Sequence, residues 1–376
     1  MAGAIRFGAS VSVSGRYALQ GRQVLAGLRA WVEAVNESKG LKVHGARARV
    51  PVRLVHYDDA SSPATVAANA ERLLHLDAVD ILIGPYASDL TRAVVPVARR
   101  RGRVLWNHSG ASDALHGKGG RAVGILTPVS RYFAGLIELV RRLDSDAALV
   151  TLLHRRGSSF GRLAALGVGA VASDAKFVTD VVTYSSLACD LPGVMARLER
   201  QRPDVVISAG AYDDEVVLAR ALVESRLRPK AIALAAAAMH EFLNVLGTHA
   251  EGFIGPSQWE PGLAQAPDFG PKPGEVAGRI RALGSPPDYP AAQAYAACLI
   301  AQRCLDEAGL DDGSLWRAAC ALDCQTFFGR FRIDPATGLQ VGHEVVLMQW
   351  RRGRKLVVWP PAFSQARPLY PGRRRG

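Results

Sequence analysis

The 376-residue sequence has no run of about 18 consecutive apolar residues, the length that a membrane-spanning helix needs. We therefore expect no insertion into a membrane. Cysteine is also scarce, with five in the chain and none before Cys189. Because there is no C-x2-C pair, and because Cys320 and Cys324 on an expected helix lack a histidine pair at ligand spacing, we expect no metal site. Buried thiols are favoured, with one disulfide as the alternative.

Two nucleotide-binding patterns are missing. No G-x-G-x-x-G follows the first expected strand, and no G-x-x-x-x-G-K-[ST] occurs anywhere, so we expect no nucleotide cofactor. The first seven residues also lack the basic and apolar regions of an export signal. The expectation is a cytoplasmic protein if Met1 is the native start, and a periplasmic one if a signal was removed.

Acidic residues are outnumbered: 34 Asp and Glu stand against 46 Lys and Arg, which gives a net charge of +12. A nucleic-acid-binding protein would concentrate its cations on one element, with interleaved aromatic residues. Here the arginines are scattered along the chain and end in Arg373, Arg374 and Arg375. We expect a solvated basic surface and no nucleic-acid partner, with a modest attraction for acidic ligands as the alternative.

The residues that are present favour two α/β domains. A hydrophobic content of 49% can fill buried cores, and the length suits two domains of middling size. In the first third, apolar runs of strand length alternate with amphipathic helical patterns, which is typical of a parallel sheet covered by helices. The expected strands are residues 5–13, 50–57, 80–84 and 103–107, and the helices lie around 24–35, at 64–76 and at 91–100.

The alternation starts again after residue 126 and then becomes less regular. Its expected strands are residues 147–153, 176–184, 204–208 and 230–234, with helices at 131–142, 161–173, 191–200, 214–224 and 239–246. The last third has helices at 275–283, 289–308 and 315–321 and strands at 327–333, 345–350 and 356–359. The long helix and the final hairpin need different sheets, so we expect the chain to return to the first domain and end on the second.

Two local patterns could carry chemistry. Residues 157–161 fit G-x-S-x-G between a strand and a helix, which makes Ser159 a candidate nucleophile of a serine hydrolase. The alternative, which we favour, is a strand-to-helix turn that uses serine as a cap and glycine for close packing. Asp58 and Asp59 could hold a metal, but adjacent carboxylates point to opposite sides of a strand, and a cap for the next helix is favoured.

Small polar residues recur where a strand ends and a helix begins. They occupy residues 14–21, 84–88 and 109–113, after the first, third and fourth expected strands. In doubly wound sheets the ligand crevice lies beyond the carboxyl ends of the strands, and backbone N–H groups at helix starts there attract anions such as a carboxylate. Three such turns on neighbouring strands predict one side of a ligand pocket.

At these residues the sequence resembles the type I periplasmic binding proteins, in the branch of the leucine/isoleucine/valine-binding proteins and the related amide sensors. The likeness runs from about Ile5 to Trp359, and the order and spacing of the matching stretches carry it. These stretches are residues 14–21, 57–64, 84–91, 110–112, 160–161, 203–212, 251–256, 292–295 and 328–338.

The resemblance implies an α/β fold of two Rossmann-like lobes, joined by three hinge crossovers, that close on a small ligand. We expect lobe 1 to comprise residues 4–126 and 253–330, and lobe 2 residues 127–252 and 331–361. Residues 362–376 are expected to form a basic, flexible tail.

The resemblance also implies a set of ligand-binding residues. In lobe 1, Ser88 and Ser112 would hold the polar end of the ligand, Gly110 and Ala111 would lend main-chain groups, and Gln20 stands where amino-acid binders carry an aromatic residue. In lobe 2 the residues implied to face the ligand are aromatic. They are Phe160, Tyr212 and Trp259, the last being a pocket wall or, equally, a core residue.

One departure concerns ligand charge. Amino-acid binders of the family keep a glutamate for the ligand's ammonium group, whereas this chain has four alanines at 235–238, with Glu241 as the nearest carboxylate in sequence. A buried ammonium without a counter-charge is costly, so an amide, a urea-like compound or a carboxylate fits better than a plain branched-chain amino acid.

We therefore expect a solute-binding protein that performs no covalent chemistry and hands a small polar organic ligand to the membrane permease of an ABC transporter. The alternative is a cytosolic ligand sensor of the same fold that controls a regulatory protein. A serine hydrolase using Ser159 is the remote alternative.

Overall fold

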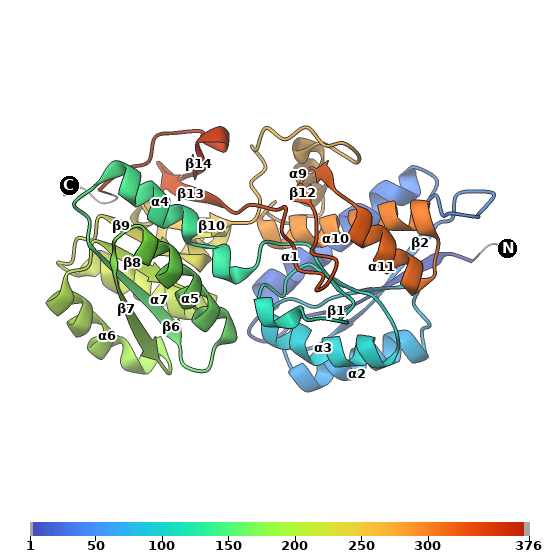
Figure 1. The fold of residues 1–376 in the computed structure, drawn as a ribbon, viewed down its shortest axis with the longest axis horizontal. Helices are drawn as coiled ribbons and strands as arrows, with labels where there is room; N and C mark the ends of the chain where they lie inside the picture. The colour runs from blue at the N-terminus through green and yellow to red at the C-terminus, as the bar shows by residue number, and fades with distance from the viewer. Residues whose placement is uncertain (1–2, 372–376) are drawn as a thin grey trace. The chain divides into compact units, whose positions relative to one another are not determined.

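The computed structural model describes residues 3–371, which form two compact units (Figure 1). The first unit comprises the chain up to Pro128 together with Pro261–Glu344, and the second comprises Val129–Glu260 and the chain from Val345 onward. The chain therefore passes between the units three times, as expected. None of the helices described between residues 3 and 371 combines the length and apolar character that crossing a membrane requires.

The first unit contains a five-stranded parallel sheet in the order β2-β1-β3-β4-β5. Its strands are β1 (Ile5–Val11), β2 (Val52–Asp58), β3 (Ile81–Ile83), β4 (Leu105–Asn107) and β5 (Ala122–Gly124). The expected strands of the first third are confirmed, and β5 is an addition. A short hairpin is formed by β11 (Cys324–Thr326) and β12 (Gly329–Phe331).

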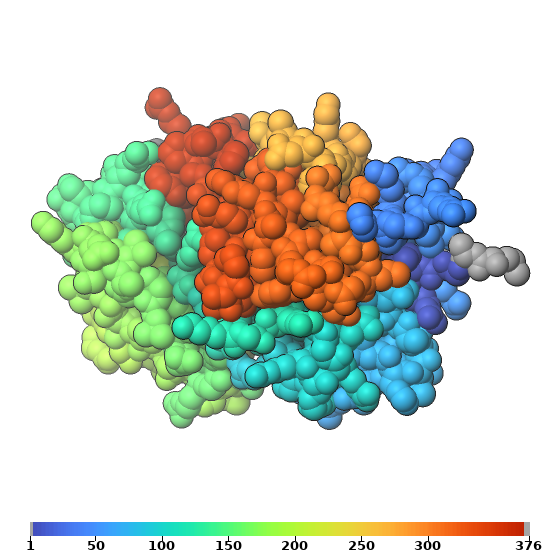
Figure 2. Space-filling model, turned by 45° about the vertical axis from the view of Figure 1, so that its right-hand side comes forward, coloured from blue at the N-terminus to red at the C-terminus, as the bar shows by residue number. Residues whose placement is uncertain are grey.

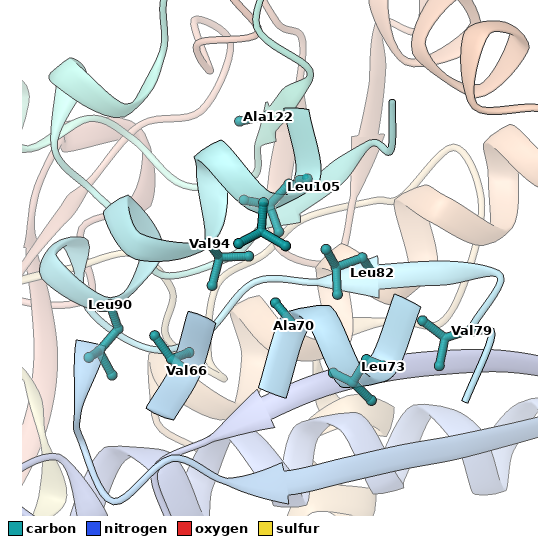
Figure 3. Packing of buried hydrophobic residues seen from close by; sticks show 11 residues of the cluster. Val66, Ala70, Leu73, Val79, Leu82, Leu90, Val94, Leu105 and Ala122 are labelled. Atoms are coloured by element: carbon teal, nitrogen blue, oxygen red, sulfur yellow. The ribbon is translucent and has the colours of Figure 1, made fainter. Parts of the chain in front are cut away.

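Helices cover both faces of this sheet. They are α1 (Ala18–Glu37), α2 (Pro63–His75), α3 (Ser88–Arg100), η1 (Asp113–Leu115), α9 (Pro273–Ala282), α10 (Tyr289–Ala308) and α11 (Asp312–Ala321). Helices α2 and α3 pack on one face, where their apolar residues meet β3 and β4 in a buried cluster (Figure 3). Helices α1 and α10 pack together on the other face (Figure 1). On the surface of this unit, residues coloured orange lie beside residues coloured blue, so segments far apart in sequence are neighbours (Figure 2).

The second unit repeats this topology and extends it. Its seven-stranded sheet has the order β14-β13-β10-β9-β8-β6-β7. Strands β7 to β10 run parallel to β6, β13 is antiparallel to β10, and β14 is antiparallel to β13. The strands are β6 (Leu149–Arg155), β7 (Val178–Tyr184), β8 (Val205–Ser208), β9 (Ala231–Leu234), β10 (Ile254–Ser257), β13 (Val346–Arg351) and β14 (Arg354–Trp359). As expected, the long helix α10 lies in the first unit and the final hairpin in the second.

The helices of the second unit also lie on both faces of its sheet. They are η2 (Val129–Arg131), α4 (Ala134–Leu143), α5 (Ser159–Asp174), α6 (Leu187–Gln201), α7 (Tyr212–Glu224), η3 (Ala235–Ala238), α8 (His240–Leu246), η4 (Gly247–Ala250) and η5 (Pro361–Phe363). Helices α4 and α5 contact one another, as do α6 and α7, and each pair packs on its own side of the strands (Figure 1).

The unit boundaries differ from the expected ones by up to 14 residues. The expected second lobe took in residues 331–344, which here pack with the first unit. The reason is a set of hydrogen bonds to β5 and its neighbours: the Gly124 N–H donates to the Gly338 carbonyl at 2.8 Å, and the Gln340 side chain donates to the Ile125 carbonyl at 3.2 Å. The crossover therefore lies after Glu344.

The C-terminal segment runs along the second unit as far as it is described. The Gln349 side chain exchanges hydrogen bonds with the main chain of Leu369, and the Tyr370 hydroxyl donates to Asp144 at 2.9 Å. Residues 364–370 are thus attached, where a flexible tail was expected, while Arg373, Arg374 and Arg375 lie outside the described residues.

The prediction of buried thiols is confirmed for three of the five cysteines. Cys298, Cys304 and Cys324 are buried free thiols, Cys320 is partly buried and Cys189 is exposed. Burial raises the pKa of the Cys298 thiol, which keeps it protonated and unreactive. The expectation that Cys320 and Cys324 share a helix is wrong, because α11 ends at Ala321 and Cys324 begins β11.

Candidate ligand-binding site

The strand order of each unit reverses at one place. In the first unit it reverses between β1 and β3, which are hydrogen-bonded neighbours although β2 separates them in the chain. In the second unit the corresponding neighbours are β6 and β8. Ligands of open α/β sheets bind beyond the carboxyl ends of strands at such switch points. Gln20 and Ser88 follow β1 and β3, and Phe160 and Tyr212 follow β6 and β8, so four predicted residues fall at the two switch points.

Ser88 and Ser112 are in direct contact. The Ser112 N–H donates to the Ser88 hydroxyl oxygen at 3.0 Å, which joins the loops after β3 and β4. Both residues are buried, and the Ser112 hydroxyl oxygen has no hydrogen-bond partner among the described residues. A buried hydroxyl without a partner is costly, so the Ser112 hydroxyl oxygen is available to bind a further polar group.

The backbone before Ser88 adopts a rare conformation. Ala87 has φ of 70°, a region that L-residues rarely occupy, and it immediately precedes the first residue of α3. The Thr91 hydroxyl donates to the Ala87 carbonyl at 2.9 Å and helps to hold this turn. Strain of this kind is found mainly where the surrounding structure fixes a functional loop.

Gly110 lies where the structure has no space for a side chain. A Cβ at this position would approach the Asn107 Oδ1 to 2.8 Å and the Thr91 Oγ1 to 2.7 Å. The Asn107 side chain accepts from the Gly110 N–H at 2.7 Å and donates to its carbonyl at 2.8 Å. The N–H of Gly110 is thus already engaged, so Gly110 fixes the loop that carries Ala111 and Ser112 and has no free N–H to lend.

The loop between β1 and α1 depends on the two aspartates that sequence reasoning assigned as helix caps. That assignment is wrong, because Ser62 caps α2 by accepting from the Thr65 N–H. Asp59 is fully buried and instead accepts from the hydroxyls of Ser10 and Ser12. Asp58 accepts from the main-chain N–H groups of residues 13, 14 and 60.

Two tyrosines beside this loop were missed as candidates, although both stood in the loops already singled out. The rings of Tyr17 and Tyr86 meet edge to face at 5.6 Å, and they follow β1 and β3. The Tyr17 hydroxyl donates to Asp89 on α3 at 3.1 Å. Gln20 lies on the same helix as the Tyr17 cap and is buried. Tyr17 and Tyr86 add an aromatic surface to the predicted polar one.

The second unit places Phe160 and Tyr212 on helix starts. Phe160 lies in the first turn of α5, partly exposed, with its ring edge to face against Tyr132 at 5.6 Å. Tyr212 is the first residue of α7 and is also partly exposed. Trp259 is fully buried, and its carbonyl accepts from the Ser257 hydroxyl at 2.8 Å, which agrees with the core alternative.

The G-x-S-x-G stretch is a helix start. Ser158 caps α5 by accepting from the Gly161 N–H at 3.1 Å, and Ser159 is the first residue of the helix. A Cβ on Gly161 would lie 2.4 Å from the Cβ of His154, so this glycine lets α5 approach β6 closely. The capping and packing interpretation of residues 157–161 is confirmed.

A sequence model of the periplasmic binding protein family matches residues 4–355 of the chain. The chain belongs to this family. The leucine-binding protein LivK from Thermotoga maritima is similar in structure, with a TM-score of 0.80, 17% identity, and coverage of 94% of this chain and 97% of that one.

Two further solved structures resemble this binding protein. The branched-chain amino acid transporter substrate-binding protein LivJ from Streptococcus pneumoniae, in complex with isoleucine, has a TM-score of 0.78 at 18% identity, covering 94% of this chain and 97% of its own. An ABC transporter solute-binding protein from R. palustris, in complex with benzoate, has a TM-score of 0.75 at 18% identity, covering 95% and 96%. These likenesses show the fold.

The charged side chains next to the four alanines of this binding protein differ from those expected from the sequence. The nearest carboxylate in sequence is Glu241, but the structure brings the Glu215 carboxylate to the Ala236 N–H at 2.5 Å. On the other side, the buried Lys355 ammonium donates to the Ala238 carbonyl at 3.0 Å and pairs with Glu260 at 3.2 Å. Sequence spacing could not have found Glu215 or Lys355, because both lie on other elements.

Proposed function

We propose that this periplasmic binding protein captures a small polar organic ligand with residues of both units and delivers it to the membrane permease of an ABC transporter, outside the cytoplasmic membrane. The observation that carries the proposal is the position of Gln20, Ser88, Phe160 and Tyr212 beside the two switch points. The buried Ser112 hydroxyl, without a partner among the described residues, gives the ligand's polar end a place in the first unit.

The charges favour an amide or a carboxylate over an amino acid. The four alanines carry no ionisable group, Glu215 already accepts two main-chain N–H groups, and Glu260 is paired with Lys355. None of these carboxylates is positioned to neutralise an ammonium, which would need a counter-charge when buried. The benzoate complex of a structural relative supports the carboxylate class, and the leucine and isoleucine relatives provide the comparison compounds.

The test is a thermal-unfolding screen of the purified chain with benzoate, benzamide, acetamide, urea, L-leucine and L-isoleucine. A ligand that binds only the folded protein stabilises it by about 2.7 kcal/mol at a hundredfold excess over Kd. We expect benzoate or an amide to raise the unfolding temperature more than either amino acid. If no compound raises it, the proposed ligand class is wrong, and larger shifts with leucine would reverse the charge argument.

We also propose that binding involves no covalent chemistry. Ser159 lies in a helix start whose cap is Ser158, and the family is one of binding proteins. We expect wild type and a Ser159→Ala variant to show the same background rate with an activated ester such as p-nitrophenyl acetate. A serine-dependent rate would instead support the hydrolase.

A further inference from the structure

Glu215 in the first turn of α7 is a fully buried carboxylate that joins two loops. One of its oxygens accepts from the Gly210 N–H at 2.7 Å, and the other accepts from the Ala236 N–H at 2.5 Å. Gly210 follows β8 and Ala236 follows β9, and these two strands are neighbours in the sheet. The carboxylate therefore connects the carboxyl ends of adjacent strands.

No cation compensates Glu215. Among the described residues it forms no ion pair, and burial raises its pKa to about 8, an effect that the main-chain donors partly oppose. Burying a carboxylate without a cationic partner is unfavourable unless its hydrogen bonds are well made. The hydrogen bonds from the Gly210 and Ala236 N–H groups are short and well made. They also fix the main chain of the two loops that contain these residues.

The alanine turn η3 cannot hold itself in place, because its side chains are methyl groups. Three polar side chains from other elements bind its main chain. Glu215 accepts from the Ala236 N–H, the Trp350 indole donates to the Ala237 carbonyl at 2.8 Å, and Lys355 donates to the Ala238 carbonyl at 3.0 Å. A Cβ at Gly255 would lie 2.4 Å from the Ala238 nitrogen, so β10 supports the turn directly. Glu215 provides the contact from the helix side.

The other loop also lies directly against Glu215. A Cβ at Gly210 would be 2.5 Å from the Tyr184 hydroxyl oxygen and 3.3 Å from the Glu215 Cγ, so the loop packs directly against both side chains. Tyr212 follows two residues later as the first residue of α7. The carboxylate thus fixes the main chain on the approach to Tyr212.

We propose that Glu215 is a positioning residue, whose carboxylate sets the main-chain geometry of residues 210–212 and of the turn 235–238. The inference rests on the proposed function in one respect: these two loops are taken to form the ligand-facing surface of the second unit. The main-chain geometry itself can be tested without a ligand.

The first experiment uses amide and Cα resonances of the full-length, isotope-labelled protein. A Glu215→Gln variant keeps the size of the side chain but turns an NH2 group toward one of the two N–H donors. We expect the amide protons of Gly210 and Ala236 to shift more than any others, with further changes confined to residues 210–212 and 235–238. The matched control is Glu224→Gln on the same helix, at an exposed position, and it should leave these signals unchanged.

A Glu215→Met variant separates positioning from stability. Methionine fills a similar volume and is apolar, so it suits the buried position, and the unfolding midpoint checks that the protein folds. Loss of the acceptor by itself shifts the amide protons of Gly210 and Ala236. If Glu215 only stabilised the fold, the Cα signals of residues 211, 212, 237 and 238 would stay at their wild-type positions once this variant has folded. Shifted Cα signals of residues 211, 212, 237 and 238 in the folded variant support the proposal, and unchanged Cα signals at these residues overturn it.

The second experiment measures affinity, with benzoate as the probe. We expect about tenfold weaker binding by Glu215→Gln and wild-type binding by Glu224→Gln. Equal affinity of Glu215→Gln and wild type would overturn the positioning role in binding. If wild type itself binds no benzoate, the proposed ligand class fails, while the Cα signals still decide whether Glu215 positions the two loops.

Discussion

Ser88, Asn107 and Asp59 share a role in the first unit: each side chain fixes the main chain of a loop beyond a strand. Ser88 accepts from the Ser112 N–H, Asn107 binds both polar groups of Gly110, and Asp59 accepts from the hydroxyls before α1. Pre-ordered loops reduce the entropy lost on ligand binding. Main-chain order beneath the ligand surface is therefore as important as the residues that would contact the ligand.

His108 also supports one of these loops, from a buried position beneath it. Its Nδ1 lies 2.6 Å from the Ser109 hydroxyl oxygen, which also accepts from the Gln293 amide at 2.7 Å. His108 is fully buried, and burial lowers its pKa to about 4. The imidazole is neutral at pH 7 and belongs to the support of the loop that continues to Ser112.

This gives a pH-dependent prediction. Between pH 6.5 and pH 4 the unfolded chain takes up a proton at His108 that the folded chain does not, so stability falls as the pH falls. From pH 7.5 to 5.5 we expect wild type to lose about 1 kcal/mol more unfolding free energy than His108→Gln. Urea unfolding at the two pH values measures the difference. The pKa values of His56 and His116 are also lowered, but both residues are present in both proteins, so their contributions cancel in the comparison. An equal loss of unfolding free energy in wild type and His108→Gln would show that His108 does not titrate in this way.

The sequence predicted which loops carry polar residues but not the partners of those residues. Ser88 and Ser112 are 24 positions apart, and Glu215 and Ala236 are 21 apart, so each contact depends on strand order. Asp58 and Asp59 show the same limit: the local pattern favoured a cap, whereas the actual donors come from the end of β1. Local spacing contains no information about such partners.

Helices α1 and α10 of the first unit pack closely together, and a glycine permits this contact. A Cβ at Gly27 on α1 would lie 2.0 Å from the Ala291 carbonyl oxygen on α10, so the two backbones nearly touch. Gln20 lies on the same helix, in its first turn.

Two glycine substitutions should therefore have opposite effects. We expect Gly27→Ala to lower the unfolding free energy by about 1–3 kcal/mol, because the helices must separate. Gly278→Ala, on α9 where the added Cβ meets nothing within 4 Å, should raise it by about 0.5–1 kcal/mol through helix propensity. Denaturant unfolding of both variants tests this, and a stable Gly27→Ala protein would mean that the contact is looser than described.

The strands and helices with strong periodicity were predictable, whereas the short strands β5, β10 and β11 were missed. Strand β5 has only three residues and ends in Gly124, while β10 contains Gly255 and Pro256. Proline has no N–H group to donate to a neighbouring strand, and glycine has a low strand propensity, so the sequence of neither segment predicts a strand. Both strands lie just before a crossover, which is why the unit boundaries were also displaced.

Each unit places its candidate residues in the same topological position. The parallel strands follow the order 2-1-3-4-5 in both, and the added hairpin β13-β14 distinguishes the second unit. In the proposed function the repeated topology provides two ligand-facing surfaces, one polar with Ser88 and Ser112 and one aromatic with Phe160 and Tyr212. A ligand with a polar end and an apolar body matches this pair.

The central claim is that one small molecule is held by residues of both units, and calorimetric titration tests it most directly. The titrations compare wild type, Ser88→Ala and Phe160→Ala, using the compound that stabilises the protein most. Ser314→Ala on α11 and Leu166→Ala on α5 are the controls in the respective units. We predict one molecule bound per chain, with affinity at least about fivefold weaker in each site variant, which corresponds to about 1 kcal/mol, and unchanged in the controls. Wild-type affinity in either Ser88→Ala or Phe160→Ala would contradict binding by residues of both units.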